Sequence, residues 1–140
     1  MSSEPKTKPT GASVEAFIEA VEPTGRREDA RVVCQMLGEV SGCEPEMWGP
    51  SIVGFGRYRY TGPNGKPAEW PRIGFSPRKA NLVMYLAPGF EQQQALMSRL
   101  GKHKVGVSCL YLGRLKDIDM TALRELAERS LATTRERYPA

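Results

Sequence analysis

The fold of this chain is decided by residues 51–65, which read Ser-Ile-Val-Gly-Phe-Gly-Arg-Tyr-Arg-Tyr-Thr-Gly-Pro-Asn-Gly. Residues 51–55 and 57–61 are rich in β-branched and aromatic side chains, a composition typical of strands. The Gly62-Pro63-Asn64-Gly65 segment predicts a tight turn. The strands before and after this turn should therefore form an antiparallel hairpin. Further strands are expected over residues 71–75, 81–86 and 105–112, and the first four strands together predict a meander.

The segments before, between and after the predicted strands carry apolar residues at helical spacing. Ser13 is typical of a helix N-cap, and the helix that follows must end before Pro23. A second helix is expected from about Arg26 to Ser41, with Gly42 at its exit, and others over residues 90–100 and from Asp119 to Pro139. The element order ααββββαβα predicts a single α+β domain over residues 13–139, with helices packed on an antiparallel sheet, preceded by a disordered tail over residues 1–12.

Composition places the chain among ordinary globular proteins. It has 140 residues and a net charge of +4, a mild excess that favours anionic partners slightly but lacks the clustering typical of nucleic-acid binding. Three cysteines without a C-x-x-C pair argue against a disulfide framework or a zinc site, and favour a reducing, cytoplasmic location. We expect no signal peptide, no membrane-spanning segment and no cofactor.

Basic residues on two glycine-flanked loops predict an anion site. Glycines at 101 and 106 let backbone amides approach a phosphate or carboxylate, and the loop at residues 76–81 is expected at the same end of the sheet. A solvated basic loop with no ligand is the alternative interpretation. The expected ligand-binding residues are Arg78, Lys79, Lys102, His103 and Lys104, with Trp48 or Tyr111 as an aromatic wall.

No catalytic signature accompanies these residues. His103 is the sole histidine, and Ser108 and Cys109 alternate along a strand, so at most one of them can face it. We therefore expect a binding or accessory protein and not an enzyme. Nucleic-acid binding is not expected, because alternation puts Tyr58 and Tyr60 on the face opposite Arg57 and Arg59.

A set of short motifs runs through nearly the whole chain. In order they are Met47-Trp48-Gly49-Pro50, the hairpin strand at residues 57–61, Trp70-Pro71, Gly74-Phe75-Ser76-Pro77-Arg78-Lys79, Asn81-Leu82, Tyr85-Leu86, Pro88-Gly89-Phe90, Gly101-Lys102-His103-Lys104 and Ser108-Cys109-Leu110-Tyr111. Together they resemble the YdhG-like domain-of-unknown-function family, which is mostly bacterial. The resemblance implies a single α+β domain, and one branch of the family is described as a frataxin-like intracellular iron chaperone.

An iron-binding role is accordingly the first alternative. Hard iron cations accept carboxylate oxygens, and three glutamates at i, i+4 and i+7 should share one face of the first helix. An ordinary polar helix face is the competing interpretation. The candidate ligands are Glu15, Glu19, Glu22, Glu28 and Asp29. A second alternative is an interaction domain that forms a homodimer through an uncovered sheet face.

Overall fold

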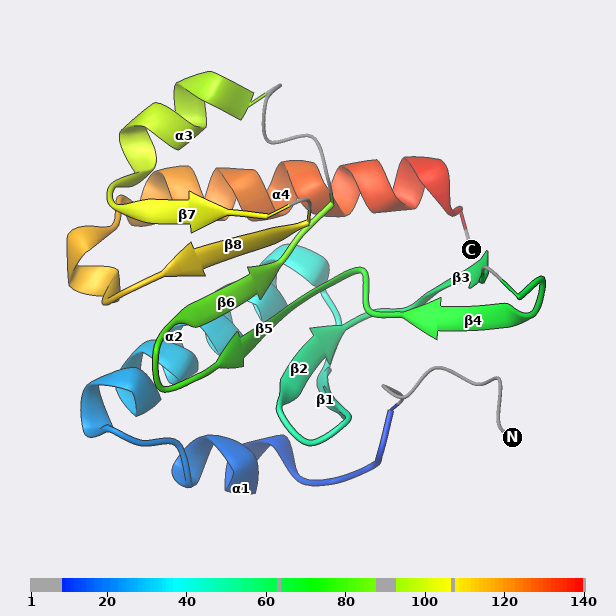
Figure 1. The fold of residues 1–140 in the computed structure, drawn as a ribbon, viewed down its shortest axis with the longest axis horizontal. Coiled ribbons are helices and arrows are strands. Elements are labelled where there is room, and N and C mark those ends of the chain that lie inside the picture. The colour runs from blue at the N-terminus through cyan, green and yellow to red at the C-terminus, as the bar shows by residue number, and fades with distance from the viewer. Residues whose placement is uncertain (1–8, 63, 88–92, 107, 140) are drawn as a thin grey trace.

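The computed structural model describes residues 9–62, 64–87, 93–106 and 108–139. It contains a six-stranded antiparallel sheet, a separate two-stranded hairpin and helices packed on the sheet, so the predicted α+β class is confirmed (Figure 1). The elements are α1 (Val14–Glu19), α2 (Thr24–Ser41), β1 (Pro45–Trp48), β2 (Ile52–Phe55), β3 (Tyr58–Thr61), β4 (Pro67–Trp70), β5 (Ile73–Pro77), β6 (Leu82–Tyr85), α3 (Gln94–Leu100), β7 (His103–Val105), β8 (Cys109–Leu112), the 3₁₀ turn η2 (Leu115–Asp117) and α4 (Met120–Arg137). No helix among these residues is long and apolar enough to cross a membrane.

Local signals predicted three of the helix ends correctly. Ser13 and Asp119 cap α1 and α4, each accepting a hydrogen bond from a backbone amide three residues further on. Gly42 ends α2 with a left-handed φ of 68°, a conformation that glycine adopts without a steric penalty. The first helix is shorter than predicted and ends at Glu19. Of the predicted disordered tail over residues 1–12, residues 1–8 lie outside the described residues, as does the predicted helix start over residues 90–92. In the described part of the tail, Pro9 forms a bridge with Trp48 and the Thr10 amide donates to the Met47 carbonyl at 3.0 Å.

The strand order differs from the predicted meander. The large sheet runs β1-β2-β5-β6-β8-β7, and β3 pairs only with β4. The strands β1 and β4 were not expected. The predicted strand over residues 105–112 is divided between β7, which ends at Val105, and β8, which begins at Cys109, because the backbone turns back at Gly106, whose amide donates to the Cys109 carbonyl. The order therefore has six strands before α3 and two after it, where the sequence predicted four and one.

One bent ribbon joins the sheet to the hairpin. The pair Phe55–Ile73 closes the β2–β5 ladder and Tyr58–Trp70 opens the β3–β4 ladder, with two residues between them on each strand. The two ladders thus share one register. The bend lies at Gly56, with φ of 73°, and at Pro71, which has no amide hydrogen to donate. The ribbon leaves the sheet there, and its β3–β4 end extends away from the other strands (Figure 1).

The main core lies between the sheet and the helices. A row of paired residues crosses the sheet through Val53, Phe75, Met84 and Leu110, and all four are buried in one cluster with residues of α2, α3 and α4. Side chains alternate between faces along a strand, so the neighbouring positions face away from these helices. In Figure 1 the helices α2 and α4 pass behind the sheet, and no described helix covers the face toward the viewer.

The second face carries a smaller aromatic core at its β1 edge. The ring of Trp48 is fully buried and lies edge-on to Trp70, with 6.2 Å between ring centroids, and Trp70 lies edge-on to Tyr85 at 6.1 Å. Gly54 makes room for the indole, since a Cβ there would lie 2.5 Å from Trp48 Cδ1 and 2.7 Å from Pro71 Cβ. The bend of the ribbon therefore folds Trp70 and Pro71 over this half of the face.

Replacing Gly54 by alanine should destabilise the fold by about 1–3 kcal/mol, because ring and proline atoms must move to accept the new methyl group. Gly38 is the matched control: a Cβ there meets atoms no closer than 3.8 Å, at ordinary contact distance. Gly38→Ala should stabilise α2 by about 0.5–1 kcal/mol through helix propensity. Urea unfolding of both variants measures the two free energies, and equal changes would contradict the close packing at Gly54.

A buried carboxylate ties α2 to the segment before α4. Asp29, 6% exposed, accepts hydrogen bonds from the Arg114 Nε at 2.8 Å and from the Leu115 amide at 3.1 Å. Gly25 permits this, since a Cβ there would lie 2.3 Å from the Arg114 guanidinium. Arg26 lies beside the pair and donates to the Gly113 carbonyl at 2.7 Å, so both arginines hold the β8–α4 connection against the start of α2.

We expect Asp29→Ala to lower the free energy of unfolding by about 1–3 kcal/mol, mainly because the Leu115 amide loses its acceptor in a buried position. Arg114 adds less, because its side chain is 43% exposed and water screens the ion pair. Glu28→Ala, one residue earlier on an exposed position of the same helix, should change stability by less than about 0.5 kcal/mol. Chemical denaturation of the two variants makes the comparison, and equal losses would show that Asp29 is not a structural link.

Candidate functional site

The half of the second sheet face at the β7 edge brings Arg78, Lys104 and Tyr111 together, beside the buried Ser76 and Val83. Lys104 lies opposite Tyr111, Tyr111 opposite Val83, and Val83 opposite Ser76, in one row across β7, β8, β6 and β5. This row is offset by one residue from the core row, so its side chains point away from the helices. Directly opposed residues have Cβ atoms about 4.5–5.5 Å apart, which makes Lys104 and Tyr111 neighbours.

Arg78 crosses this face from the β5–β6 turn. Its Nη2 donates to the Tyr85 hydroxyl at 2.8 Å, and its Nε lies 3.4 Å from the Ser76 hydroxyl. Because Ser76 and Tyr85 belong to successive rows of the second face, the guanidinium lies over the sheet and not beyond its end. We name the group Arg78, Tyr85, Lys104, Cys109 and Tyr111 the aromatic–basic face.

The other predicted residues lie around the face or away from it. Lys79 and Lys102 are exposed on loops at the same end of the sheet. The last row of paired residues at that end consists of Pro77, Leu82, Leu112 and His103. Strand β8 separates β6 from β7, so these loops lie about two strand spacings, or roughly 10 Å, apart. His103 belongs to a core row, and its Nδ1 donates to the Gly101 carbonyl at 2.7 Å.

Trp48 is not part of this group. It lies on β1, at the opposite edge of the sheet from β7, and its ring is fully buried beneath Trp70. The prediction of Trp48 as a ligand-contacting wall is therefore wrong. Tyr85, which sequence reasoning missed, stands beside Arg78 instead. The hydroxyl-bearing Tyr85 in the otherwise apolar run of residues 82–86 was the available signal.

Charge is distributed unevenly along the chain. Residues 73–86 and 101–112, the segments around β5–β6 and β7–β8, hold Arg78, Lys79, Lys102 and Lys104 and no aspartate or glutamate. The other 16 of the 20 lysines and arginines equal the 16 acidic residues in number. The charge of the remaining chain therefore sums to zero, and these two segments account for the net charge of +4. They are neighbours through the β6–β8 pairing, and their positive potential acts on one region of the surface.

The hairpin residues that invited a nucleic-acid interpretation are engaged elsewhere. Arg57 makes two hydrogen bonds of 2.9 Å with the carboxylate of Glu46, and Arg59 lies 3.9 Å from Glu69. The ring of Tyr58 stacks on Tyr138 with 4.4 Å between centroids, which fixes the hairpin against the end of α4.

The five predicted iron ligands do not form one site. Glu22 lies beyond the end of α1, Glu19 pairs with Arg31, and Asp29 is buried against Arg114. Across the described ranges no group of three or more His, Cys, Asp or Glu side chains could hold a metal ion. The shared helix face predicted for the three glutamates is wrong, because α1 spans only six residues.

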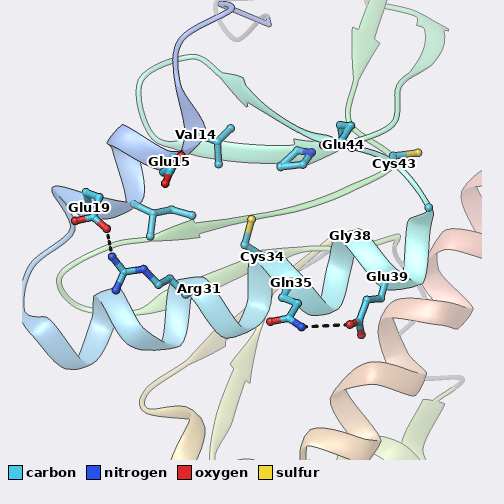
Figure 2. Close-up of a pocket in the computed structure, with 13 residues that line it drawn as sticks. Val14, Glu15, Glu19, Arg31, Cys34, Gln35, Gly38, Glu39, Cys43 and Glu44 are labelled. Carbon is cyan, nitrogen blue, oxygen red and sulfur yellow. Dashed lines mark hydrogen bonds and ion pairs between the residues drawn. The ribbon is translucent and has the colours of Figure 1, made fainter.

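A concave site lies on the helical side, between α1, α2 and β1 (Figure 2). It has a volume of about 680 Å³ and includes Glu15, Glu19 and the thiol of Cys34. Burial raises the pKa of Cys34 above its ordinary value. Sequence reasoning named Glu15 and Glu19 as iron ligands but did not predict this cleft, because the two helices meet β1 only through the tertiary fold. Comparisons with known proteins identify no relative: no family model, no curated protein and no solved structure matches the chain.

The pKa of Tyr85 should report the position of Arg78. Partial burial raises the pKa of Tyr85, and the positive charge and hydrogen bond of Arg78 oppose this rise. Arg78→Gln removes the charge and should raise the Tyr85 pKa further. Tyrosine ring signals in an NMR pH titration measure the change. A lower or unchanged Tyr85 pKa in the variant would contradict the contact, and Lys116→Gln, on exposed η2, serves as the control.

Proposed function

We propose that this chain is a small cytoplasmic binding protein that holds an anionic ligand on the aromatic–basic face. The observation that carries the proposal is the concentration of the whole net charge on residues 73–86 and 101–112, which are joined by the β6–β8 pairing. Such a concentration without acidic residues raises the local concentration of anions and favours their binding. The free thiols of Cys34, Cys43 and Cys109 suit a reducing compartment.

The cations of this region lack carboxylate partners. Within the described chain Lys79, Lys102 and Lys104 form no ion pair, whereas arginines 31, 57, 59, 99, 114, 124 and 129 each lie within 4.0 Å of a carboxylate. Among the residues that the structure describes, the partners of Arg78 are the neutral Ser76 and Tyr85. Its guanidinium retains donors for a phosphate or carboxylate, and the fixed hydrogen bond to Tyr85 holds it in place.

The aromatic rings add selectivity for the body of the ligand. Tyr85 and Tyr111 are half-buried on neighbouring strands, on the same face as Arg78 and Lys104. A tyrosine ring offers a stacking surface for a planar group, and each stacking contact adds about 1–3 kcal/mol in single-stranded nucleic-acid complexes. The proposed ligand is therefore a phosphate or carboxylate joined to a planar ring.

A titration followed by ¹H–¹⁵N NMR tests this function with inorganic phosphate and adenosine monophosphate as probes. We expect shifts confined to β5–β8 and their turns, and tighter binding of the nucleotide because its base adds stacking. Arg78→Gln and Lys104→Gln should each weaken binding roughly two- to fivefold, as expected for one exposed charge. Lys116→Gln is the matched control and should leave binding unchanged. Shifts elsewhere, or equal losses in all three variants, would reject the site.

The same charge distribution bears on the homodimer alternative. A two-fold dimer built on the aromatic–basic face would place the face of one copy against the same face of the other. Two copies of the same positively charged surface would then face each other, and like charges oppose such an interface. The geometry therefore favours an anionic ligand over a second copy on this face.

Membership of the YdhG-like family stays a part of the proposal. The α+β arrangement with helices packed on an antiparallel sheet supports it. The iron-chaperone role of one branch finds no support in the positions of the predicted carboxylates, which pair with Arg31 and Arg114 or lie apart.

A further inference from the structure

The cleft between α1, α2 and β1 combines an apolar floor with an acidic rim. Its floor includes Val14, Ile18, Cys34 and Pro45, and Gly38 contributes no side chain to it. The volume of about 680 Å³ is in the range of sites that hold drug-sized molecules. In Figure 2 the Cys34 side chain projects from α2 toward α1 and β1, between Val14 and Cys43. An occupant of this cleft would therefore touch the thiol.

Carboxylates outnumber cations around the cleft. Glu15, Glu19, Glu39 and Glu44 line it, and Arg31 is the one cationic residue among the lining side chains of the described structure. Glu19 pairs with Arg31, and Glu39 accepts a 2.9 Å hydrogen bond from Arg124, so these two charges are balanced locally.

The remaining two carboxylates have no balancing charge. Glu15 and Glu44 are exposed and form no ion pair or hydrogen bond with any side chain that the structure describes. They come from different elements, the first turn of α1 and the connection between α2 and β1, and Figure 2 shows them on the two sides of Cys34. The cleft thus offers an apolar surface flanked by two negative charges.

We infer that this cleft binds an organic cation, an ammonium or guanidinium group carried on an apolar body. The apolar body would cover the floor at Cys34 and Ile18, and the cation would pair with Glu15 or Glu44. A neutral ligand would leave both carboxylates unpaired, and an anionic ligand would be repelled by them. This site lies on the helical side of the sheet and does not depend on the anion site proposed above.

Three probes of equal chain length separate these cases: hexylammonium, 1-hexanol and hexanoate. In a ¹H–¹⁵N NMR titration we expect hexylammonium to shift amides of α1, α2 and β1 and to bind more tightly than the other two. Glu15→Gln and Glu44→Gln should each weaken hexylammonium binding roughly two- to fivefold. Glu128→Gln, on an exposed position of α4 outside the cleft, should have no effect.

Alkylation by iodoacetamide gives a second, independent measurement. At alkaline pH, which offsets the raised pKa of Cys34, hexylammonium should slow modification of Cys34 and leave Cys109 unaffected, because Cys109 lies on the other side of the sheet. Peptide mass spectrometry reads each thiol separately. Equal binding of hexanol, preference for hexanoate, unchanged binding in both glutamine variants, or an unprotected Cys34 would each overturn the inference.

Discussion

The constraint on which the rest of the structure depends is the alternation of side chains along each strand, combined with helices that cover only one face of the sheet. Val53, Phe75, Met84 and Leu110 point toward these helices and form the core. Their neighbours along the strands must then point the other way. Arg78 lies over those neighbours, and Lys104 and Tyr111 are among them, so the need for one core creates the second surface with its different chemistry.

The bent ribbon divides that second surface into two halves. At the β1 edge, Trp70 and Pro71 fold back over Trp48 and Gly54, which closes this half as a small aromatic core. At the β7 edge no described element folds back, and the cations of the β5–β6 and β7–β8 segments lie there. Tyr85 joins the two halves, because its ring lies edge-on to Trp70 and its hydroxyl accepts a hydrogen bond from Arg78, so a substitution in the aromatic core can also move Arg78.

Sequence reasoning succeeded where the signals were local. The caps Ser13 and Asp119 and the exit at Gly42 follow from residues that are neighbours in the chain, and each was predicted. The strand β1 and the burial of Trp48 depend on pairing with β2 and on the distant Trp70, which no local pattern encodes. The anion-site residues were named from loop composition, but the contact of Arg78 with Tyr85 and the acidic cleft arise only from tertiary packing.

The common register of the two ladders in the bent ribbon limits how this protein can change in length. A single inserted residue on one strand between Gly56 and the hairpin tip would shift every later cross-strand partner by one place. An insertion directly after Gly56 would turn Tyr58 to the opposite side of the hairpin and break its stacking on Tyr138. Insertions and deletions here should be tolerated only at the tip of the hairpin or as matched pairs on both strands, which gives a practical guide for grafting a tag or peptide.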